Sequence, residues 1–394
     1  MFFEISKSKN EHFSSSRLLK NSLVINVDSG WEEHTINEHQ LFFKGYHNEK
    51  FSNFDLFLKT IEDPTPKFQG NFFIILVDNK NCVITHDIGR ASPLVKKESS
   101  ISNLYAVTDS NAKTNIWADR FLTVDESFNV KENVFSPYTN VFPEYDLSSA
   151  LKRVDNILSE AFESFLINNN KPIKLFLTGG IDTITLYAYL DRFTKKYEII
   201  DFEYKKFTHF YRQNWQKRLQ KFWAYKQIHS WGEDPTVLVT GGNGDEYFLR
   251  GPVTANMMLM HYNINMCEAL EQYPECYHYD YFKKEKNYKI FVDQQNDNKL
   301  KLQLKFKENT IKNILNILIN DHQHWHIDGT IFFTPFKNIE IAKTILGLSK
   351  TEFVQQVLDA SFQKQLIKNI DPDKLKFLSK FKNQDSLKFS NTTF

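Results

Sequence analysis

The sequence has little glycine, few cysteines and no long apolar run, and each shortage narrows what the chain can be. Its 394 residues include 13 glycines and 3 cysteines. Cys82, Cys267 and Cys276 form no C-x-x-C pair, so neither a disulfide framework nor a zinc ribbon is expected. Reduced thiols are typical of the cytosol, and we therefore expect a cytoplasmic location.

Two further absences concern membranes and charged partners. The start, MFFEISKSKNEHF, has no charged segment followed by a long apolar run, so we expect no signal peptide. No apolar stretch approaches the roughly 20 residues that cross a bilayer. The formal net charge is +1, which gives the whole chain no pull toward nucleic acid or an anionic membrane. The sequence leaves the oligomeric state open, with a homodimer among the options.

Large aromatic side chains are abundant, with 36 phenylalanines available for a core. Residues 1–145 are β-rich: NFFIILVD (71–78) and NCVITHD (81–87) predict a hairpin around DNKN, and 103–109 predict another strand. Helical periodicity is hard to find before residue 145. Residues 148–172 then predict a helix capped by Ser148 or Ser149, with an apolar face at helical spacing formed by Leu151, Val154, Leu158, Ala161, Phe165 and Leu166.

Strands and helices alternate after that helix. IKLFLTGG, YEIIDFEY and TVLVTGG predict strands, with helices between them, and the chain is mostly helical from about residue 305. This alternation favours βαβ units and a parallel sheet. We therefore expect an α/β protein with two domains, residues 1–145 and residues 146–394.

The stretch LTGGIDTITL places two glycines and an aspartate between a strand and a helix, in a chain that uses glycine sparingly. Such a turn binds anions, because the first amides of a helix have no intrahelical acceptor and the helix dipole adds positive potential. Asp182 suits a phosphate site if Mg²⁺ lies between the carboxylate and the phosphate.

A second glycine turn, GGNGDE (241–246), also follows a strand. Carboxyl ends of parallel strands meet at one edge of the sheet, so Asp182 and Asp245 can clamp one magnesium nucleotide there. No G-x-x-x-x-G-K-[ST] occurs, and GGNGDEY lacks the last glycine of G-x-G-x-x-G. The Walker and dinucleotide-binding interpretations are therefore excluded.

These motifs resemble those of a known family. TGGIDT is similar to the pyrophosphate loop of the N-type ATP pyrophosphatases, usually Ser-Gly-Gly-x-Asp-Ser. TGGNGDEYFLRG looks like the second signature of the asparagine synthetase branch, which includes β-lactam synthetases and lasso-peptide cyclases. FQGNFFIILVDNKNCVITHDIGRASPL (68–94) and FFTPFKNIEIAKTILGLS (332–349) add similarity on either side.

The resemblance implies a fold and an activity. The fold would be an N-terminal Ntn-hydrolase-like sandwich followed by a parallel-sheet PP-loop domain with a helical C-terminal part. The activity would be an ATP-dependent, AMP- and pyrophosphate-forming amide ligase acting on a small molecule or peptide that bears a carboxylate. Pyrophosphate and Mg²⁺ would be held by Thr178, Gly179, Gly180, Asp182 and Thr183, with Asp245 as second metal ligand and Gly241 and Gly242 near the ribose.

The chain also departs from the family. Glutamine-using members carry cysteine after the initiator Met, whereas this sequence has Phe2, so the resemblance implies a sandwich domain that hydrolyses no glutamine. Free ammonia or a substrate amine would then be the acceptor. The family's late catalytic lysine is matched best by Lys382 and next by Lys380.

Other interpretations stay open. The basic aromatic segment 205–226 suits a nucleic-acid platform, so a PP-loop enzyme that modifies tRNA or nucleotides is the second hypothesis after the amide ligase. For the segment itself, an amphipathic helix with a solvated basic face is favoured. His322, His324 and His326 would share a face only on a strand, so a metal site there is not favoured. A catalytically inactive relative that still binds nucleotide is the third hypothesis.

Overall fold

The computed structural model describes residues 3–10, 13, 15–28, 30–88, 94–103, 114–116, 119–135, 144–177, 179–200, 237–250, 262, 318 and 331–379. Most of the strand expected over 103–109 lies outside these residues, as does the helix expected between YEIIDFEY and TVLVTGG. Within them the fold is mixed α/β, with antiparallel sheets, one parallel sheet and helices. No helix in this described part is long and apolar enough to cross a membrane.

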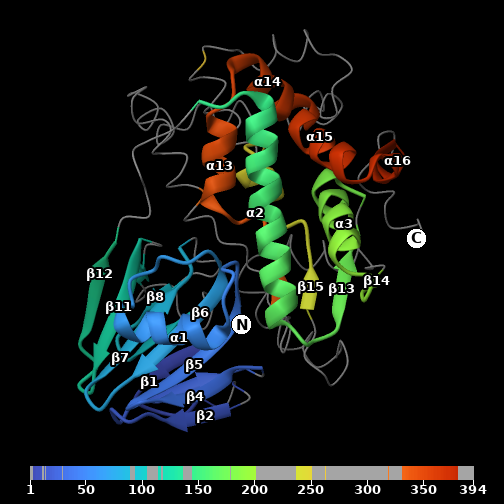
Figure 1. Cartoon of the computed structure of the whole chain (residues 1–394). Coiled ribbons are helices and arrows are strands. Elements are labelled where there is room, and N and C mark those ends of the chain that lie inside the picture. Colours follow the sequence, from blue (N-terminus) through green and yellow to red (C-terminus); the bar gives the residue numbers. More distant parts are fainter. Residues whose placement is uncertain are drawn as a thin grey trace, which may run out of the picture.

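The described residues up to Phe135 form two antiparallel sheets packed face to face (Figure 1). One sheet has the order β10-β8-β9-β1-β3-β2 and the other β12-β11-β7-β6-β5-β4. Their strands are β1 (Phe3–Ser6), β2 (Ser15–Leu18), β3 (Val24–Val27), β4 (Glu32–Ile36), β5 (His39–His47), β6 (Gly70–Val77), β7 (Asn81–His86), β8 (Leu94–Lys96), β9 (Ser100–Ser102), β10 (Thr114–Ile116), β11 (Arg120–Asp125) and β12 (Val130–Val134).

The predicted hairpin is confirmed as β6 and β7, whose pairing runs from Phe73 opposite His86 to Val77 opposite Cys82. All the residues of strand β6 are buried. Since successive side chains point to opposite sides of a strand, both faces of β6 must be covered. Phe73 and Ile75 enter the core between the two sheets, and Cys82 is buried in the same core. Phe72 and Ile74 lie in a second apolar cluster on the other face.

That second cluster is covered by α1 (Asn53–Glu62), a helix in the region where little helical periodicity was found in the sequence. Helix α1 begins at a capping box, in which Ser52 and Asp55 each accept a hydrogen bond from the other's backbone amide. Leu56 and Phe57 are buried against the sheet. Leu58 and Ile61 pack against the same cluster. In a helix of only 10 residues the periodic signal is short, and the Ser-x-x-Asp cap was the clearer sign.

The parallel sheet has the order β14-β13-β15-β16, and its neighbouring strands are all parallel. Its strands are β13 (Ile173–Phe176), β14 (Glu198–Ile200), β15 (Val237–Val239) and β16 (Ile331–Phe333). The first three were predicted. Strand β16 was missed because its three residues, Ile-Phe-Phe, carry too little pattern to be told from a loop.

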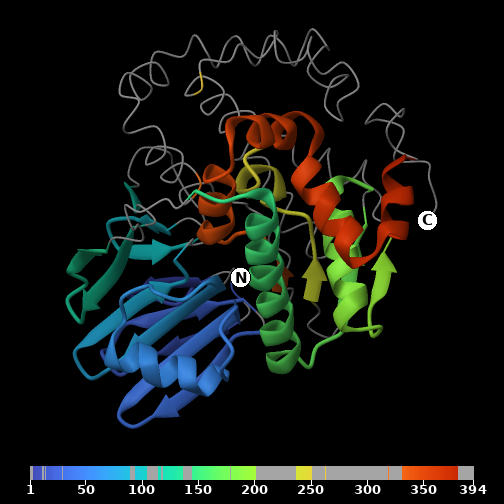
Figure 2. The ribbon, with the colours of Figure 1, turned by 45° about the horizontal axis from the view of Figure 1, so that its top comes forward.

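Helices cover this sheet. The 22-residue α2 (Leu147–Asn168) is the long central helix in Figures 1 and 2, with the sandwich on one side and α3 (Ile181–Phe193) on the other. Asp146, rather than Ser148 or Ser149, caps α2 by accepting a hydrogen bond from the Ser149 amide. The later helices are α13 (Ile339–Leu346), α14 (Lys350–Asp359), α15 (Ser361–Ile370) and α16 (Leu375–Ser379).

Strand β5 of the sandwich packs directly on the second half of the chain. Tyr46 lies edge-on to Phe333 with ring centroids 4.8 Å apart, and its hydroxyl accepts a hydrogen bond of 2.9 Å from the Thr334 amide. Ser164 of α2 donates to the backbone carbonyls of His47 and Glu49. Buried aromatic contacts and hydrogen bonds therefore hold the sandwich against α2 and β16.

Candidate functional site

The order of the parallel strands reverses direction between β13 and β15. From β13 the chain continues through helix α3 to β14, which lies toward one edge of the sheet. After β15 the next strand of the sheet is β16, which lies toward the opposite edge. The connections after β13 and β15 therefore diverge at their carboxyl ends, which is where open parallel sheets bind ligands. The two glycine turns predicted from the sequence follow these two strands.

The first turn contains Gly179, whose φ of +79° lies in the left-handed region that glycine adopts without strain. Gly180 is the N-cap of α3. In the first helical turn, the Thr183 hydroxyl donates a 3.0 Å hydrogen bond to the Gly180 carbonyl. Asp182 places a carboxylate beside the positive end of the helix dipole, where negative charge is stabilised.

The second turn packs directly against the first. A side chain at Gly244 would meet the Asp182 carboxylate carbon at 2.3 Å, and one at Gly241 would meet the Asp182 and Thr183 side chains at 2.9 Å. Only glycine allows this approach. The geometry thus brings Gly179, Gly180, Asp182, Thr183, Gly241, Gly242 and Asp245 together at one edge of the sheet.

Arg250 joins the two aspartates. Its Nη2 lies 2.6 Å from Asp182 Oδ1 and 2.8 Å from Asp245 Oδ1. The Arg250 side chain is 1% exposed, whereas that of Asp245 is 53% exposed. The two carboxylates are therefore close neighbours that share one buried cation.

The backbone after the second turn explains the position of Arg250. Helix α6 (Gly244–Tyr247) ends with Leu249 in the left-handed region, at φ +57°. The Leu249 amide donates to the Glu246 carbonyl and the Arg250 amide to the Asp245 carbonyl. This is a Schellman motif, which reverses the chain at a helix end and here returns Arg250 to Asp245.

Two buried glutamines support this ion cluster from α14 and α15. Gln363 Nε2 donates to Asp182 Oδ1 at 2.7 Å, and Arg250 Nε donates to Gln363 Oε1 at 2.7 Å. Gln356 accepts a hydrogen bond of 2.8 Å from the Phe362 amide. Both glutamines are fully buried. Neither Arg250 nor Gln363 was predicted from the sequence. The only local sign for Arg250 was its position, five residues after Asp245 in the second glycine motif. No local pattern pointed to Gln363.

Opposing effects set the charge of the site. Burial raises the pKa of Asp182 from 3.8 to about 6, while the neighbouring Arg250 cation lowers it and the Asp245 charge raises it.

In the second glycine turn Asn243 is 2% exposed at φ +64°, and its side-chain nitrogen has no hydrogen-bond partner among the described residues. A buried donor without an acceptor is costly, so an acceptor for this nitrogen would stabilise the turn.

The donor chemistry fits Mg²⁺, which binds proteins through one or two carboxylates and completes its shell with phosphate oxygens and water. Asp182 and Asp245 would hold the ion. No group of three or more His, Cys, Asp or Glu side chains that could hold a metal without a ligand's help is found among the described residues.

Several predicted residues lie outside the described residues: Thr178, Lys380, Lys382, the three histidines at 322–326 and the basic aromatic segment 205–226. Their proposed roles stay predictions.

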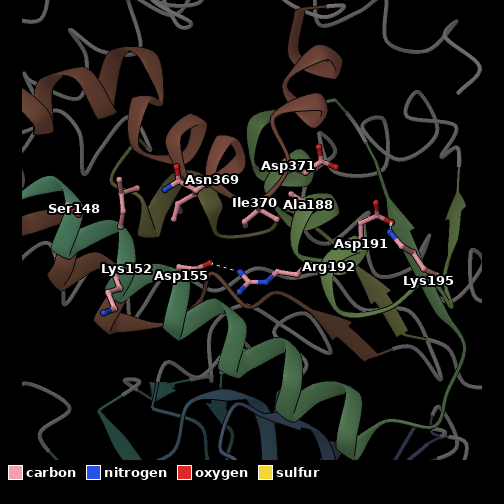
Figure 3. A pocket seen from close by; sticks show the side chains of 12 residues that line it. Ser148, Lys152, Asp155, Ala188, Asp191, Arg192, Lys195, Asn369, Ile370 and Asp371 are labelled. Carbon is pink, nitrogen blue, oxygen red and sulfur yellow. Dashed lines mark hydrogen bonds and ion pairs between the residues drawn. The ribbon is translucent and has the colours of Figure 1, made fainter.

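A separate cavity of about 640 Å³ lies between α2, α3 and α15 (Figure 3). It is bordered by Ala188 and Arg192, about 12 Å or more along α3 from Gly180 at 1.5 Å per residue. Its charges are largely paired within the protein: Arg192 lies 3.1 Å from Asp155, and Lys195 lies 2.7 Å from Asp191. No residue of the two glycine turns borders this cavity.

No protein-family model matches the chain, and no curated protein matches it. Among solved structures it is similar to a glutamine phosphoribosylpyrophosphate amidotransferase from B. subtilis, complexed with ADP and GMP. The two are 11% identical with a TM-score of 0.22, over 65% of this chain and 71% of that chain. A likeness of this size carries no argument about fold or function.

Proposed function

We propose that the chain is an ATP-dependent, AMP- and pyrophosphate-forming amide ligase of the asparagine synthetase-like type. It would activate a substrate carboxylate and pass the acyl group to ammonia or a substrate amine. The observation that carries the proposal is the close approach of two glycine turns, each with an aspartate, after the neighbouring strands β13 and β15. This arrangement supports a polyphosphate site at the first turn of α3.

The reaction would proceed in two displacements. A carboxylate oxygen attacks the α-phosphorus of ATP, and the bond to pyrophosphate breaks. The amine nitrogen then attacks the acyl carbon, the bond to AMP breaks, and the nitrogen loses a proton. Mg²⁺, when bound, would neutralise charge on the departing pyrophosphate.

The residues of the chain would act mainly by position and electrostatics. The turn at Gly179 and the first-turn amides of α3 would bind the pyrophosphate portion. Gln363 and Arg250 would fix the Asp182 carboxylate, since both donate to its Oδ1. Asn243 would donate its buried side-chain amide to the ligand.

Calorimetry with ATP and Mg²⁺ tests the nucleotide site. We expect wild-type protein to bind, and Asp182→Asn to bind at least about tenfold more weakly, which corresponds to about 1.4 kcal/mol. Asp191→Asn is the matched control, because Asp191 is also an ion-paired aspartate of α3, 2.8 Å from Lys374. Failure of folded wild-type protein to bind ATP would contradict the proposal.

Pyrophosphate release with a panel of carboxylates and amines then tests the ligase chemistry. A second candidate function, nucleotide binding without catalysis, is favoured by one observation: Arg250 is already ion-paired with both acidic residues. Bound ATP without pyrophosphate release in the presence of any carboxylate would support this second function over the first.

A further inference from the structure

Arg250 occupies the position that a bridging metal ion would take. An ion held by Asp182 and Asp245 together must lie between their carboxylates, about 2.1 Å from each ligating oxygen. Arg250 Nη2 now lies between the Oδ1 atoms of these residues, at 2.6 and 2.8 Å. A divalent ion and a guanidinium repel each other at this range, and the repulsion is weakly screened because the arginine is 1% exposed.

The arginine is fixed in this place by its surroundings. Its backbone is held by the Schellman motif after α6, through the 2.6 Å hydrogen bond from its amide to the Asp245 carbonyl. Its Nε donates to Gln363 Oε1, and Gln363 is fully buried. A side chain held at both ends is part of the built site and not a surface group that has folded in by chance.

The charges explain what this arrangement does. Asp182, Asp245 and Arg250 together carry one net negative charge when both carboxylates are ionised, whereas the two aspartates alone would carry two. A single net negative charge attracts a free divalent cation weakly. A nucleotide brings several phosphate charges, which can hold the metal and can also accept hydrogen bonds from a guanidinium.

We propose that Arg250 is the resident counter-ion of this site and a specificity-determining residue: it prevents Asp182 and Asp245 from binding a free divalent metal, so that the metal enters only together with the nucleotide. The claim that the metal enters together with the nucleotide rests on the proposed function. The claim that Arg250 suppresses binding of free metal applies to the protein without nucleotide.

The test uses Mn²⁺ as a probe for Mg²⁺ on the full chain, by electron paramagnetic resonance of free Mn²⁺ and by calorimetry. We expect wild-type protein to bind Mn²⁺ at this site only when a non-hydrolysable ATP analogue is present. Arg250→Met should bind Mn²⁺ without nucleotide at least about tenfold more tightly than wild type. Arg250→Lys keeps the positive charge and should bind Mn²⁺ no more than a few-fold more tightly than wild type.

The gained site must depend on the aspartates, so Arg250→Met combined with Asp245→Asn should lose it; Asp245 is half exposed and tolerates the change. Equal Mn²⁺ affinity of wild type and Arg250→Met would overturn the proposal. If Arg250→Met does not fold, wild type decides alone: Mn²⁺ binding that is as tight without the analogue as with it also overturns the proposal. Absence of any ATP binding, with the Mn²⁺ gain present, would instead refute the proposed function and leave the counter-ion role intact.

Discussion

Gly244 lies where any side chain would collide with the Asp182 carboxylate. A Cβ there would lie 2.3 Å from the Asp182 carboxylate, far inside contact distance. The aspartate is held by Gln363 and Arg250 and has little freedom to move away. At this position glycine is therefore required by the neighbouring chain and not by its own backbone angles.

Gly244→Ala should separate the two glycine turns and weaken ATP binding at least about tenfold, with the overall fold kept. Gly347→Ala is the matched control, because Gly347 ends α13 at an ordinary φ of −84°. Calorimetry and circular dichroism measure the two properties. Unchanged ATP affinity in Gly244→Ala would show that the close approach of the turns is not needed for binding.

Lys44 and Asp28 form an ion pair inside the sandwich, 2.8 Å apart with side-chain exposures of 1% and 3%. Trp31 also donates to Asp28, at 2.8 Å. Lys44→Met should lower the free energy of unfolding by about 3–5 kcal/mol, because it leaves a buried carboxylate without its cation.

Lys44→Met combined with Asp28→Asn should recover part of that loss, since it removes the uncompensated charge. Urea denaturation of the two variants provides the measurement. A double variant that is less stable than Lys44→Met alone would argue that Asp28 stabilises the fold through its other contacts.

At the scale of the elements, a single residue, Ala360, connects α14 to α15. Ala360 ends α14 and begins α15 in the left-handed conformation, at φ 52° and ψ 34°. It is fully buried. The turn places Gln356 of α14 and Gln363 of α15 side by side beneath Arg250, with a hydrogen bond of 3.4 Å between them.

Ala360→Gly should raise the free energy of unfolding by up to about 1 kcal/mol, because relief of about 1–2 kcal/mol of left-handed strain exceeds the added entropy of the unfolded chain. Ala188→Gly provides the contrast: Ala188 lies within α3, where glycine should cost about 1 kcal/mol or more. Thermal or chemical denaturation distinguishes them. Equal destabilisation by both substitutions would contradict the assignment of strain to Ala360.

Across the whole molecule, the sandwich and the parallel-sheet half meet at buried groups, one of which titrates. His47 is 1% exposed and stacks on Phe51 with ring centroids 5.1 Å apart. Its Nδ1 accepts a 3.3 Å hydrogen bond from the Glu49 amide. Burial lowers the pKa of His47 from 6.5 to about 4.

The unfolded chain therefore takes up this proton first as the pH falls. The His47 contribution to stability is fully present above pH 6.5 and is lost as the pH falls to 4, a difference of about 3 kcal/mol. His47→Phe keeps the aromatic stack and should lose that part of the pH dependence in urea denaturation between pH 7 and pH 4. His34→Phe, at a half-exposed histidine of β4, should leave the dependence in place.

Features that depend on local sequence patterns were predicted, whereas features that depend on contacts between distant residues were not. The β6–β7 hairpin, α2, α3 and the parallel pairing of β13 with β15 follow from local periodicity and alternation. The glycine turns were visible because glycine is rare in this chain. Arg250 and Gln363 were not, since their roles depend on a helix-end reversal and on a contact across 181 residues to Asp182. Strand β16 gains its identity only from pairing with β15.

Cys82 is a natural probe for opening of the sandwich. Its sulfur is buried in β7 between the two sheets, and burial raises the pKa of its thiol, so almost no reactive thiolate forms in the closed sandwich. Alkylation of Cys82 should thus proceed only when the sheets separate. Its rate, followed by mass spectrometry of the peptide that contains it, would time the opening of the sandwich without any introduced label.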